Sequence, residues 1–321
     1  MTDFSSGLTE NDDHALAAPE DVPGFNETFC FFGYDPDVDL AFFVHIQAKP
    51  QPWKFHLVVY LPGAREFLEC VEFSEDRIPR RPGGQRFHAE CLEPFRRWRV
   101  AASVKCGETT LGDMLARRQF GEPKRDVELD IDVHACAPLW CIGDDDATPE
   151  EHGQRGFRVH HQQLMQGAGV IRIDGVDHRF SGPVWRDHSR GPRTLTEWGT
   201  HDLNSAWFPA QRRGLGLLRQ VDIHGKVTSS FAYIVRDGML ESADIIESTP
   251  LSDGGDQDQR INVALRSADG EVHRMQGVLQ TQFLTGIGPG SWLTEGQARW
   301  TYNGEVSHGI CERSCRGLPV T

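Results

Sequence analysis

A short polar segment in the second half of the chain holds the residues best suited to acid–base chemistry. It reads Arg186-Asp187-His188-Ser189-Arg190-Gly191-Pro192-Arg193 and follows a stretch with the pattern of a β-strand. Successive side chains of a strand point to opposite faces, so Asp187, His188 and Ser189 cannot form a hydrolase triad. The same alternation places Arg186, His188 and Arg190 on one face, and Asp187 and Ser189 on the other. We expect Gly191-Pro192 to end regular strand pairing.

These residue types suit proton transfer in an enclosed site. An unperturbed histidine titrates near neutrality, and a neighbouring arginine can stabilise a developing anion. We therefore predict His188 as the proton-transfer residue, Arg190 or Arg193 as the anion stabiliser and Asp187 as the orienting group. The alternative is a structural corner, in which Asp187 pairs with Arg186 or Arg193 and His188 is a core residue with satisfied hydrogen bonds.

Two further polar groups are candidates for the same pocket. His160 and Gln162 share one face of an expected strand, about one hairpin before His188. Trp198, His201, Asp202 and Trp207 fall in an expected loop, where the indole rings either line a pocket or belong to the core. The residues predicted to contact a ligand are Arg193, His160, Gln162, Trp198, Asp202, Trp207 and Tyr233.

The sequence predicts neither a cofactor nor a metal. Gly214–Gly216 and Gly286–Gly290 are not followed by a convincing helix or by the Lys-Ser/Thr pair of a phosphate-binding loop. Cys311 and Cys315 could pair with Cys136 and Cys141 around zinc, but neither spacing is that of a zinc knuckle. The eight cysteines are spread through a long chain, which predicts reduced thiols and a cytoplasmic protein.

Composition excludes several classes of function. The chain has 321 residues, 38% hydrophobic and 25% charged, which are values typical of a folded globular protein. Its formal net charge of −14 disfavours binding to nucleic acid or to an anionic membrane surface. The N-terminus lacks the features of a secretory signal, and no apolar run is long enough to span a membrane. The sequence leaves a homodimer open.

The pattern of the chain is that of antiparallel β structure. Short alternating or β-branched runs recur from Phe25 onward, bounded by Gly, Pro or Asp, and the best helix candidate, Thr110–Phe120, is short. Four dipeptides that favour tight hairpin turns lie between such runs in the second half: Asp174-Gly175, Asp237-Gly238, Asp269-Gly270 and Asn303-Gly304. Hairpins without helical crossovers predict barrels or sandwiches, and a barrel of about eight strands can enclose an apolar cavity.

The chain divides into three parts by composition. Residues 1–24 are acidic and polar without periodicity, which predicts a disordered tail. We expect residues 25–145 to form an N-terminal β unit. A crossing rich in Asp, Gly and Pro follows Leu139, so we expect a C-terminal β unit over residues 146–321 that carries the polar segment 186–193.

Three motifs of the chain resemble a known family. They are Asn26-Glu27-Thr28 with Tyr34-Asp35-Pro36, the segment Gly169–Phe180, and Arg186-Asp187-His188-Ser189-Arg190-Gly191-Pro192-Arg193. Together they resemble bacterial proteins related to carotenoid 1,2-hydratases and AttH-like proteins, and more loosely lipocalin-like cyclases. The resemblance extends from about Asn26 to about Glu312.

The resemblance implies two lipocalin-like (calycin-type) antiparallel β-barrel or sandwich units packed together, a bound apolar ligand, and an acid–base step that needs no cofactor. Relatives usually carry Trp at the position of Arg190, in an Asp-His-x-Trp-Gly arrangement. A guanidinium repels a carbocation that an aromatic ring would stabilise, and favours an enolate, phenolate or carboxylate. The substrate expected here is therefore oxygenated, such as a terpenoid, a steroid or an aromatic ketone.

The sequence thus predicts a cofactor-independent lyase, hydratase or isomerase that acts on a hydrophobic oxygenated small molecule. The alternative is a carrier or sensor that binds such a ligand without catalysis, since the same architecture allows both.

Overall fold

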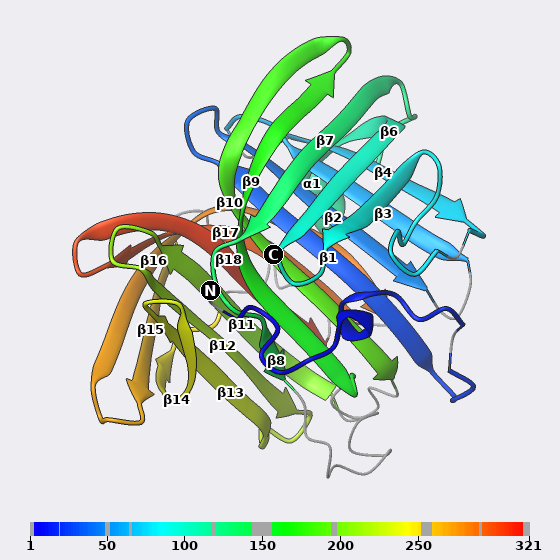
Figure 1. Ribbon diagram of the computed structural model, residues 1–321. Helices are drawn as coiled ribbons and strands as arrows, with labels where there is room; N and C mark the ends of the chain where they lie inside the picture. The colour runs from blue at the N-terminus through cyan, green and yellow to red at the C-terminus, as the bar shows by residue number, and fades with distance from the viewer. Residues whose placement is uncertain are drawn as a thin grey trace. The chain divides into compact units, whose positions relative to one another are not determined.

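The computed structural model describes residues 3–18, 20–48, 52–63, 66–76, 78–116, 120–142, 156–193, 198–251, 259–288 and 291–316. Within these ranges the chain is almost entirely antiparallel β structure, with one short 3₁₀ helix and one short α-helix (Figure 1). In chain order the elements are η1 (Glu10–Asp13), β1 (Phe25–Asp35), β2 (Leu40–Ala48), β3 (Trp53–Tyr60), β4 (Glu66–Ser74), β5 (Phe87–Glu93), β6 (Arg97–Thr110), α1 (Leu111–Leu115), β7 (Arg125–Ala135), β8 (Trp140–Ile142), β9 (Val159–Ile173), β10 (Val176–Pro192), β11 (Trp198–Phe208), β12 (Arg213–Asp222), β13 (Val227–Arg236), β14 (Met239–Ser248), β15 (Arg260–Ser267), β16 (Val272–Gly288), β17 (Ser291–Tyr302) and β18 (Glu305–Arg316).

The chain forms two compact units. Unit 1 consists of Met1–Thr109 with Phe120–Leu195, and unit 2 of Thr110–Gln119 with Thr196–Thr321. This division differs from the boundary expected at residues 145 and 146, where residues 143–155 lie outside the described parts of the chain. Residues 156–193 belong to unit 1 because their strands are hydrogen-bonded to it: β9 pairs with β7, and β10 pairs with β1 along Phe25–Gly33. The polar segment 186–193 therefore belongs to unit 1.

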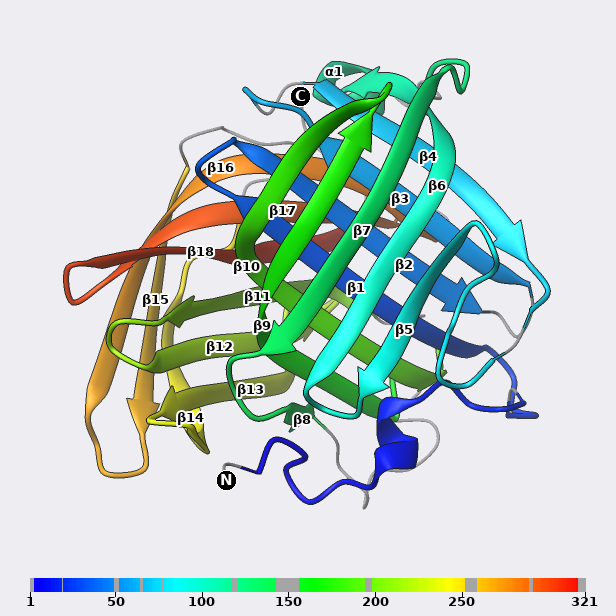
Figure 2. The same cartoon turned by 45° about the horizontal axis from the view of Figure 1, so that its top comes forward.

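Unit 1 is a ring of strands around an apolar core. Its strands follow the order β10-β1-β2-β3-β4-β6-β7-β9, and pairing between β9 and β10 joins the two ends of this run. In Figure 2 the green β9–β10 hairpin runs beside β7 and β1. Side chains that point inward, among them Phe29, Phe31, Trp53 and Trp98, form one buried cluster. This burial supplies most of the driving force for the fold.

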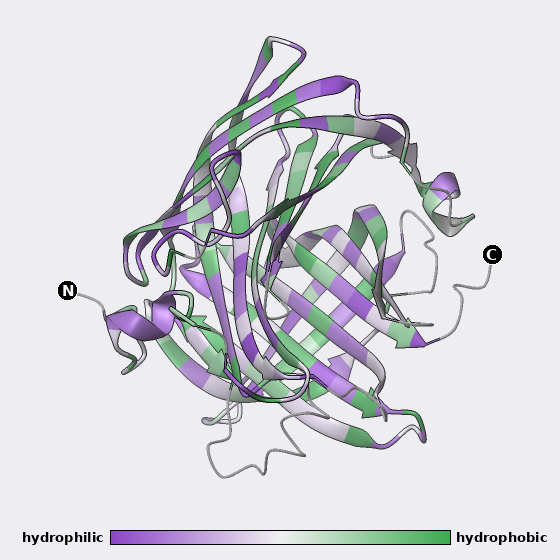
Figure 3. Cartoon of the chain, turned by 90° about the vertical axis from the view of Figure 1, so that its right-hand side faces the viewer, coloured by the Kyte–Doolittle hydropathy of each residue, from purple (hydrophilic) through white to green (hydrophobic). Residues whose placement is uncertain are grey.

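Unit 2 is a closed barrel. Strands β11 to β18 pair in sequence order, and β18 pairs with β11 to close the ring. Its interior contains Phe208, Leu217, Ile234, Met275 and Trp300, all buried. The bands of polar and apolar colour along the strands in Figure 3 reflect the period of two residues that separates the faces of a strand. Both units confirm the prediction of a mainly β fold with two barrel-like parts.

The predicted hairpins form at the predicted dipeptides. Asp174, Asp237 and Asn303 have φ of 49°, 52° and 47°, and the glycine after each has φ between 81° and 83°. Positive φ at both central positions is the geometry of a type I′ turn, which matches the twist of the strands. The expected helix is also confirmed but is confined to Leu111–Leu115, with the Thr110 hydroxyl accepting a hydrogen bond from the Asp113 N–H.

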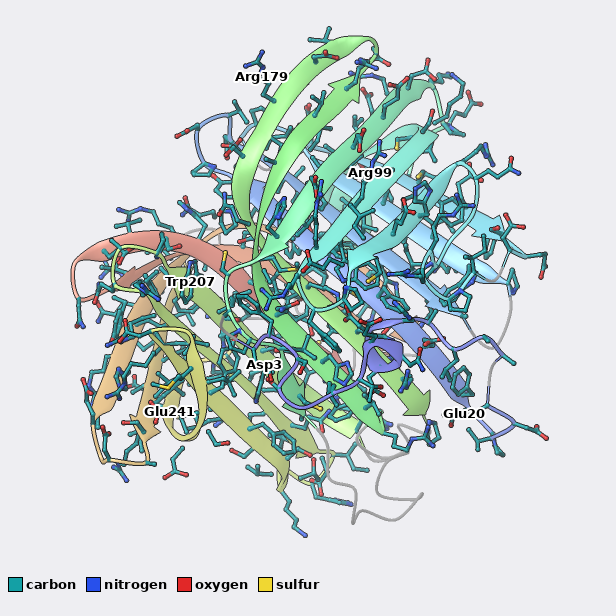
Figure 4. The ribbon with its side chains drawn as sticks, in the orientation of Figure 1. Asp3, Glu20, Arg99, Arg179, Trp207 and Glu241 are labelled. Carbon is teal, nitrogen blue, oxygen red and sulfur yellow. The ribbon has the colours of Figure 1, made fainter. Side chains whose placement is uncertain are left out.

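The prediction of a disordered tail over residues 1–24 is wrong for the described part of that segment. The helix η1 lies near the turn between β5 and β6 (Figure 2), and Asp13 is fully buried. Farther along the segment, Glu20, which Figure 4 labels, pairs with Arg158, the residue that precedes β9. Composition alone is not sufficient to predict disorder here, because an acidic segment becomes ordered when its carboxylates form ion pairs with buried basic groups.

Candidate active site

The polar segment 186–193 lies in the last part of β10, between β1 and β9. Arg186, His188 and Arg190 share a face with Val184, which belongs to the core of unit 1, so these three side chains point inward. Asp187 and Ser189 point outward. The alternation predicted from the sequence is confirmed. Regular pairing continues to Pro192, beyond the expected end, because β1 pairs with Gly191 and Pro192 as well.

The inward face holds a buried ion pair that the sequence did not predict. An Arg186 Nη2 donates to Asp13 Oδ1 at 2.6 Å, and the side chains are 1% and 0% exposed. The guanidinium also lies over the Trp98 ring, 4.3 Å from its centroid. The other Asp13 oxygen accepts from the Phe95 N–H at 2.7 Å and from the Trp98 indole N–H at 3.2 Å. These contacts connect the N-terminal segment to the interior of unit 1.

His188 is enclosed in the same interior. Its ring stacks on Phe29 with centroids 3.9 Å apart, and its Nε2 lies 3.4 Å from Glu27 Oε1. Burial, reinforced by the charges of Arg190 and Arg186, holds the pKa of His188 well below its usual value. These surroundings favour the structural alternative for His188, and its role in proton transfer stays a prediction.

Arg190 and His161 complete the inward polar group. Arg190 lies opposite Glu27 in the β1–β10 ladder and reaches Asp12 at 3.5 Å. His161, opposite His188 on β9, presents its ring edge-on to the His188 ring with centroids 5.6 Å apart. Burial and the neighbouring His188 and Arg186 lower the pKa of His161 well below its usual value. Both imidazoles are therefore neutral near pH 7.

The outward face holds a different arrangement. His160 Nε2 and Asp187 Oδ2 form a hydrogen bond between β9 and β10, in an environment where the two side chains are 10% and 8% exposed. The Gln162 amide nitrogen lies 3.3 Å from the same His160 nitrogen. A carboxylate only accepts, so the proton of this hydrogen bond belongs to His160 Nε2. The second ring nitrogen, Nδ1, is buried without a partner among the described residues.

Arg193 joins this outward group because it directly follows β10 and continues the alternation of Asp187, Ser189 and Gly191. Gly191 has φ of 138°, and a Cβ there would lie 2.5 Å from the Arg158 backbone nitrogen, so a side chain is excluded. Arg193 Nη2 donates to Ser189 Oγ at 2.9 Å and to Thr28 Oγ1 at 3.3 Å. Within the described ranges no carboxylate forms an ion pair with this guanidinium.

Electrostatics distinguish Arg193 from its neighbours. The side chain is partly exposed, but its Nε is buried and has no hydrogen-bond partner in the described structure. Burial lowers the pKa of Arg193, against the opposing effect of the Asp187 charge. A guanidinium that contacts only hydroxyl groups retains the capacity to bind an anion, because nothing neutralises it directly.

The structure places the ten predicted site residues in both units. His160, Gln162, Asp187 and Arg193 lie together on the outward face of unit 1, whereas His188 and Arg190 lie on its inward face. Trp198, Asp202, Trp207 and Tyr233 belong to unit 2. Asp187 is thus brought to His160 rather than to His188.

The expectation of a loop for Trp198–Trp207 is wrong, because this segment is strand β11. The alternation of the strand separates His201 from Asp202. Asp202 pairs with Arg219 at 3.1 Å, whereas Tyr233 shares a hydrogen bond of 2.6 Å with Ser205, and burial raises the pKa of the tyrosine. Trp207 lies near the end of β11 (Figure 4).

Sequence reasoning missed Asp13, Glu27 and His161 as parts of the interior. Glu27 was part of a quoted motif, but its role depends on β1 lying beside β10, a pairing of residues more than 150 positions apart. Its carboxylate accepts from the Leu16 N–H at 3.0 Å as well as facing His188. No periodic signal marks Asp13, which lies in an acidic run that reads as a solvated tail.

The chain matches the family described as "Domain of unknown function (DUF7064)" over residues 9–315. It belongs to this family. No curated protein sequence matches it. The match includes η1 and Asp13, which agrees with an ordered N-terminal segment.

Three crystal structures share the fold over nearly the whole chain. An AttH-like protein from Nitrosomonas europaea is 13% identical with a TM-score of 0.64, and all of each chain is covered. CghA with Sch210972 is 12% identical with a TM-score of 0.59, covering 100% of this chain and 98% of that one. Kievitone hydratase from Nectria haematococca is 11% identical with a TM-score of 0.56, covering 99% and 98%. The predicted AttH-like fold is confirmed, at a distance that shows the fold alone.

Two further features of the described residues bear on function. No helix among them is long and apolar enough to cross a lipid bilayer. No group of three or more His, Cys, Asp or Glu side chains is arranged to hold a metal ion in these ranges.

Proposed function

We propose that this protein is a cofactor-independent acid–base enzyme, a lyase, hydratase or isomerase, that acts on a hydrophobic oxygenated small molecule. The observation that carries the proposal is the outward group of unit 1, where the His160–Asp187 pair lies on the same face as Arg193, a guanidinium without a carboxylate partner in the described structure. Terpenoids, steroids and aromatic ketones have the required combination of apolar surface and oxygen function.

His160 is the proton-transfer residue in this proposal. Asp187 accepts from Nε2–H, so Nδ1 is the free basic nitrogen and takes a proton from the substrate. The Asp187 carboxylate then stabilises the imidazolium that forms, as the orienting aspartate does in other enzymes that use a histidine as the base. A positioned base of this kind contributes about 10²- to 10⁴-fold to the rate.

Arg193 is the anion stabiliser. Removal of a substrate proton next to a carbonyl group leaves an enolate, and removal from a phenol leaves a phenolate. A guanidinium already held by Ser189 and Thr28 receives that charge without reorganisation, which is the basis of electrostatic catalysis. Arg190, on the inward face, is turned toward Glu27 and Asp12 instead.

The structural neighbours support this class of chemistry by analogy. One of them is a hydratase by name, and another was crystallised with the small molecule Sch210972. Proteins of one fold can differ in activity, so the arrangement of His160, Asp187 and Arg193 is what supports the proposed chemistry.

The test is whether the protein catalyses exchange of substrate hydrogen for deuterium, or the gain or loss of water by the substrate. The protein is incubated in D₂O with a panel of terpenoids, steroids and aromatic ketones that includes 1-tetralone, and the products are followed by NMR and mass spectrometry. We expect exchange next to the carbonyl group, or gain or loss of water. His160→Gln and Arg193→Met should each lower the rate by about 10²-fold or more at an unchanged thermal midpoint.

His188→Gln is the matched variant, because His188 is the neighbouring histidine of β10 but faces the interior. A rate loss confined to His188→Gln would move the site to the inward face, as the sequence first predicted. Binding of panel compounds without exchange or mass change would identify a carrier or sensor instead of an enzyme.

A further inference from the structure

Unit 2 has an imidazole–carboxylate pair of its own. His201 on β11 and Glu312 on β18 are joined by a hydrogen bond between His201 Nε2 and Glu312 Oε1. Ser314 lies opposite His201 in the β11–β18 ladder, and Glu312 lies opposite Leu203. Since Ala206 and Cys311 face the apolar interior of the barrel, the alternation of the strands places His201, Glu312 and Ser314 on its outer face.

Ser314 determines which nitrogen of His201 carries the proton. The backbone N–H of His201 donates to Ser314 Oγ at 3.1 Å, so the serine oxygen already acts as an acceptor. Its own hydroxyl hydrogen is therefore free to be donated to His201 Nδ1, which lies 2.8 Å away. With Nδ1 accepting, the ring proton is on Nε2 and is donated to Glu312. Ser314 thus sets the tautomer of His201, because its hydroxyl group contacts both the backbone N–H and the ring of that residue.

The pair is largely withdrawn from solvent. His201 is 7% exposed and Glu312 is 9% exposed. The Trp198 ring packs against His201 with centroids 5.3 Å apart, and the Trp198 indole N–H is buried with no acceptor among the described residues. A donor left without an acceptor in such surroundings costs about 1–3 kcal/mol, which a ligand oxygen would offset.

We propose that His201 and Glu312 form a second acid–base site, in unit 2, for an apolar ligand that bears a carbonyl group. The Trp198 indole N–H donates to the carbonyl oxygen, and Glu312 takes a proton from the adjacent carbon. The C–H bond breaks, its electron pair forms the enolate C=C bond while the carbonyl bond becomes C–O⁻, and the proton is held by the carboxyl group. Return of a proton to carbon completes the exchange, so no other reactant is needed.

His201 is a positioning residue in this scheme, since its Nε2–H fixes the reactive carboxylate, and Ser314 in turn fixes His201. The site shares its substrate class with the proposed function but none of its residues. Its hydrogen bonds and its ring contact, between His201, Glu312, Ser314 and Trp198, all join residues of unit 2.

The experiment uses the full chain carrying His160→Gln, in which the unit 1 site is inactive, as the parent protein, and measures the residual exchange of 1-tetralone in D₂O above the uncatalysed background. Adding Glu312→Gln should lower this residual rate by about 10²-fold or more, because the amide cannot accept the proton. His56→Gln is the matched control, since His56 Nε2 pairs with Glu69 Oε1 at 2.8 Å between β3 and β4, which belong to unit 1. Its rate should stay within about threefold of the parent protein, the scatter expected for a variant outside the site.

A second readout does not depend on turnover. The ¹⁵N NMR signals of His201, assigned by their loss in His201→Gln, should show the Nε2–H tautomer and should shift when 1-tetralone binds. Ser314→Ala should convert the ring to a mixture of tautomers and lower the exchange rate less than Glu312→Gln does. If Glu312→Gln does not fold, Glu312→Asp withdraws the carboxylate by one methylene group and should show the same rate loss.

Two results would overturn the proposal. One is a residual exchange rate, in the chain that carries His160→Gln, that Glu312→Gln and Glu312→Asp leave unchanged, and the other is a His201 signal that 1-tetralone does not move. Failure of the unit 1 site would be seen separately: His160→Gln and Arg193→Met, each made in the otherwise unchanged chain, would then leave the exchange rate unchanged.

Discussion

Replacement of Asp13 by alanine tests whether the N-terminal segment is part of the fold. In the structure Asp13 is the counter-ion of Arg186, and it also accepts from the Phe95 N–H and the Trp98 indole. The substitution leaves a guanidinium that is 1% exposed without a carboxylate. A disordered tail would carry this aspartate in solvent, where its loss has almost no effect on stability.

The expected loss of stability follows from the burial of the pair. Removing one partner of a buried ion pair costs about 3–5 kcal/mol, because the remaining charge stays in an environment of low polarity. For a domain of about 150–250 residues each kcal/mol shifts the thermal midpoint by about 2–4 °C, so we expect a decrease of roughly 6–20 °C. The double variant Asp13→Leu with Arg186→Met should recover part of it, since no unpaired charge remains.

Differential scanning calorimetry of the full chain, supported by urea unfolding, measures this effect. Asp132→Ala is the matched control, because Asp132 pairs with Arg97 on the surface with side chains 35% and 44% exposed. That pair contributes about 0–1 kcal/mol. An Asp13→Ala protein that unfolds within about 1 kcal/mol of the parent chain would contradict the buried pair, and with it the ordered N-terminal segment.

Three further predictions concern charge and metal. Burial lowers the pKa values of His161 and His188, so below the usual histidine pKa of about 6.5 these two residues take up protons in the unfolded chain but not in the folded one. The free energy of unfolding should therefore be highest above that pH and should fall below it by up to about 1.4 kcal/mol per pH unit for each histidine. Urea titrations at several pH values measure this slope, which His161→Gln should reduce. Arg193→Met should leave the free energy of unfolding unchanged within about 1 kcal/mol or raise it, while turnover falls; a loss of stability equal to that of Asp13→Ala would show instead that Arg193 is a structural residue. Exhaustive dialysis against a chelator should leave ligand binding and exchange unchanged, and restoration of lost activity by zinc would refute the metal-free chemistry.

Local patterns in the sequence were sufficient to predict the strands and their turns. A period of two residues and Asp-Gly or Asn-Gly dipeptides act over a few positions, so β12, β13, β16 and β18 and the turn at Asn303-Gly304 could be located without tertiary information. Alternation along β10 also separated Asp187 from His188 correctly.

Which side chains meet was decided by the tertiary structure alone. The partners of Arg186, Asp187 and His188 are Asp13, His160 and Glu27, which come from three different parts of the chain. Each contact depends on the register of β10 between β1 and β9, and a shift by one residue would exchange the two faces. The pattern within one strand specifies which residues share a face, but it carries no information on the charge that a distant segment brings to that face. For that reason the acidic N-terminal segment, predicted to be a tail, contains Asp13, the carboxylate that neutralises the charge of Arg186 inside unit 1.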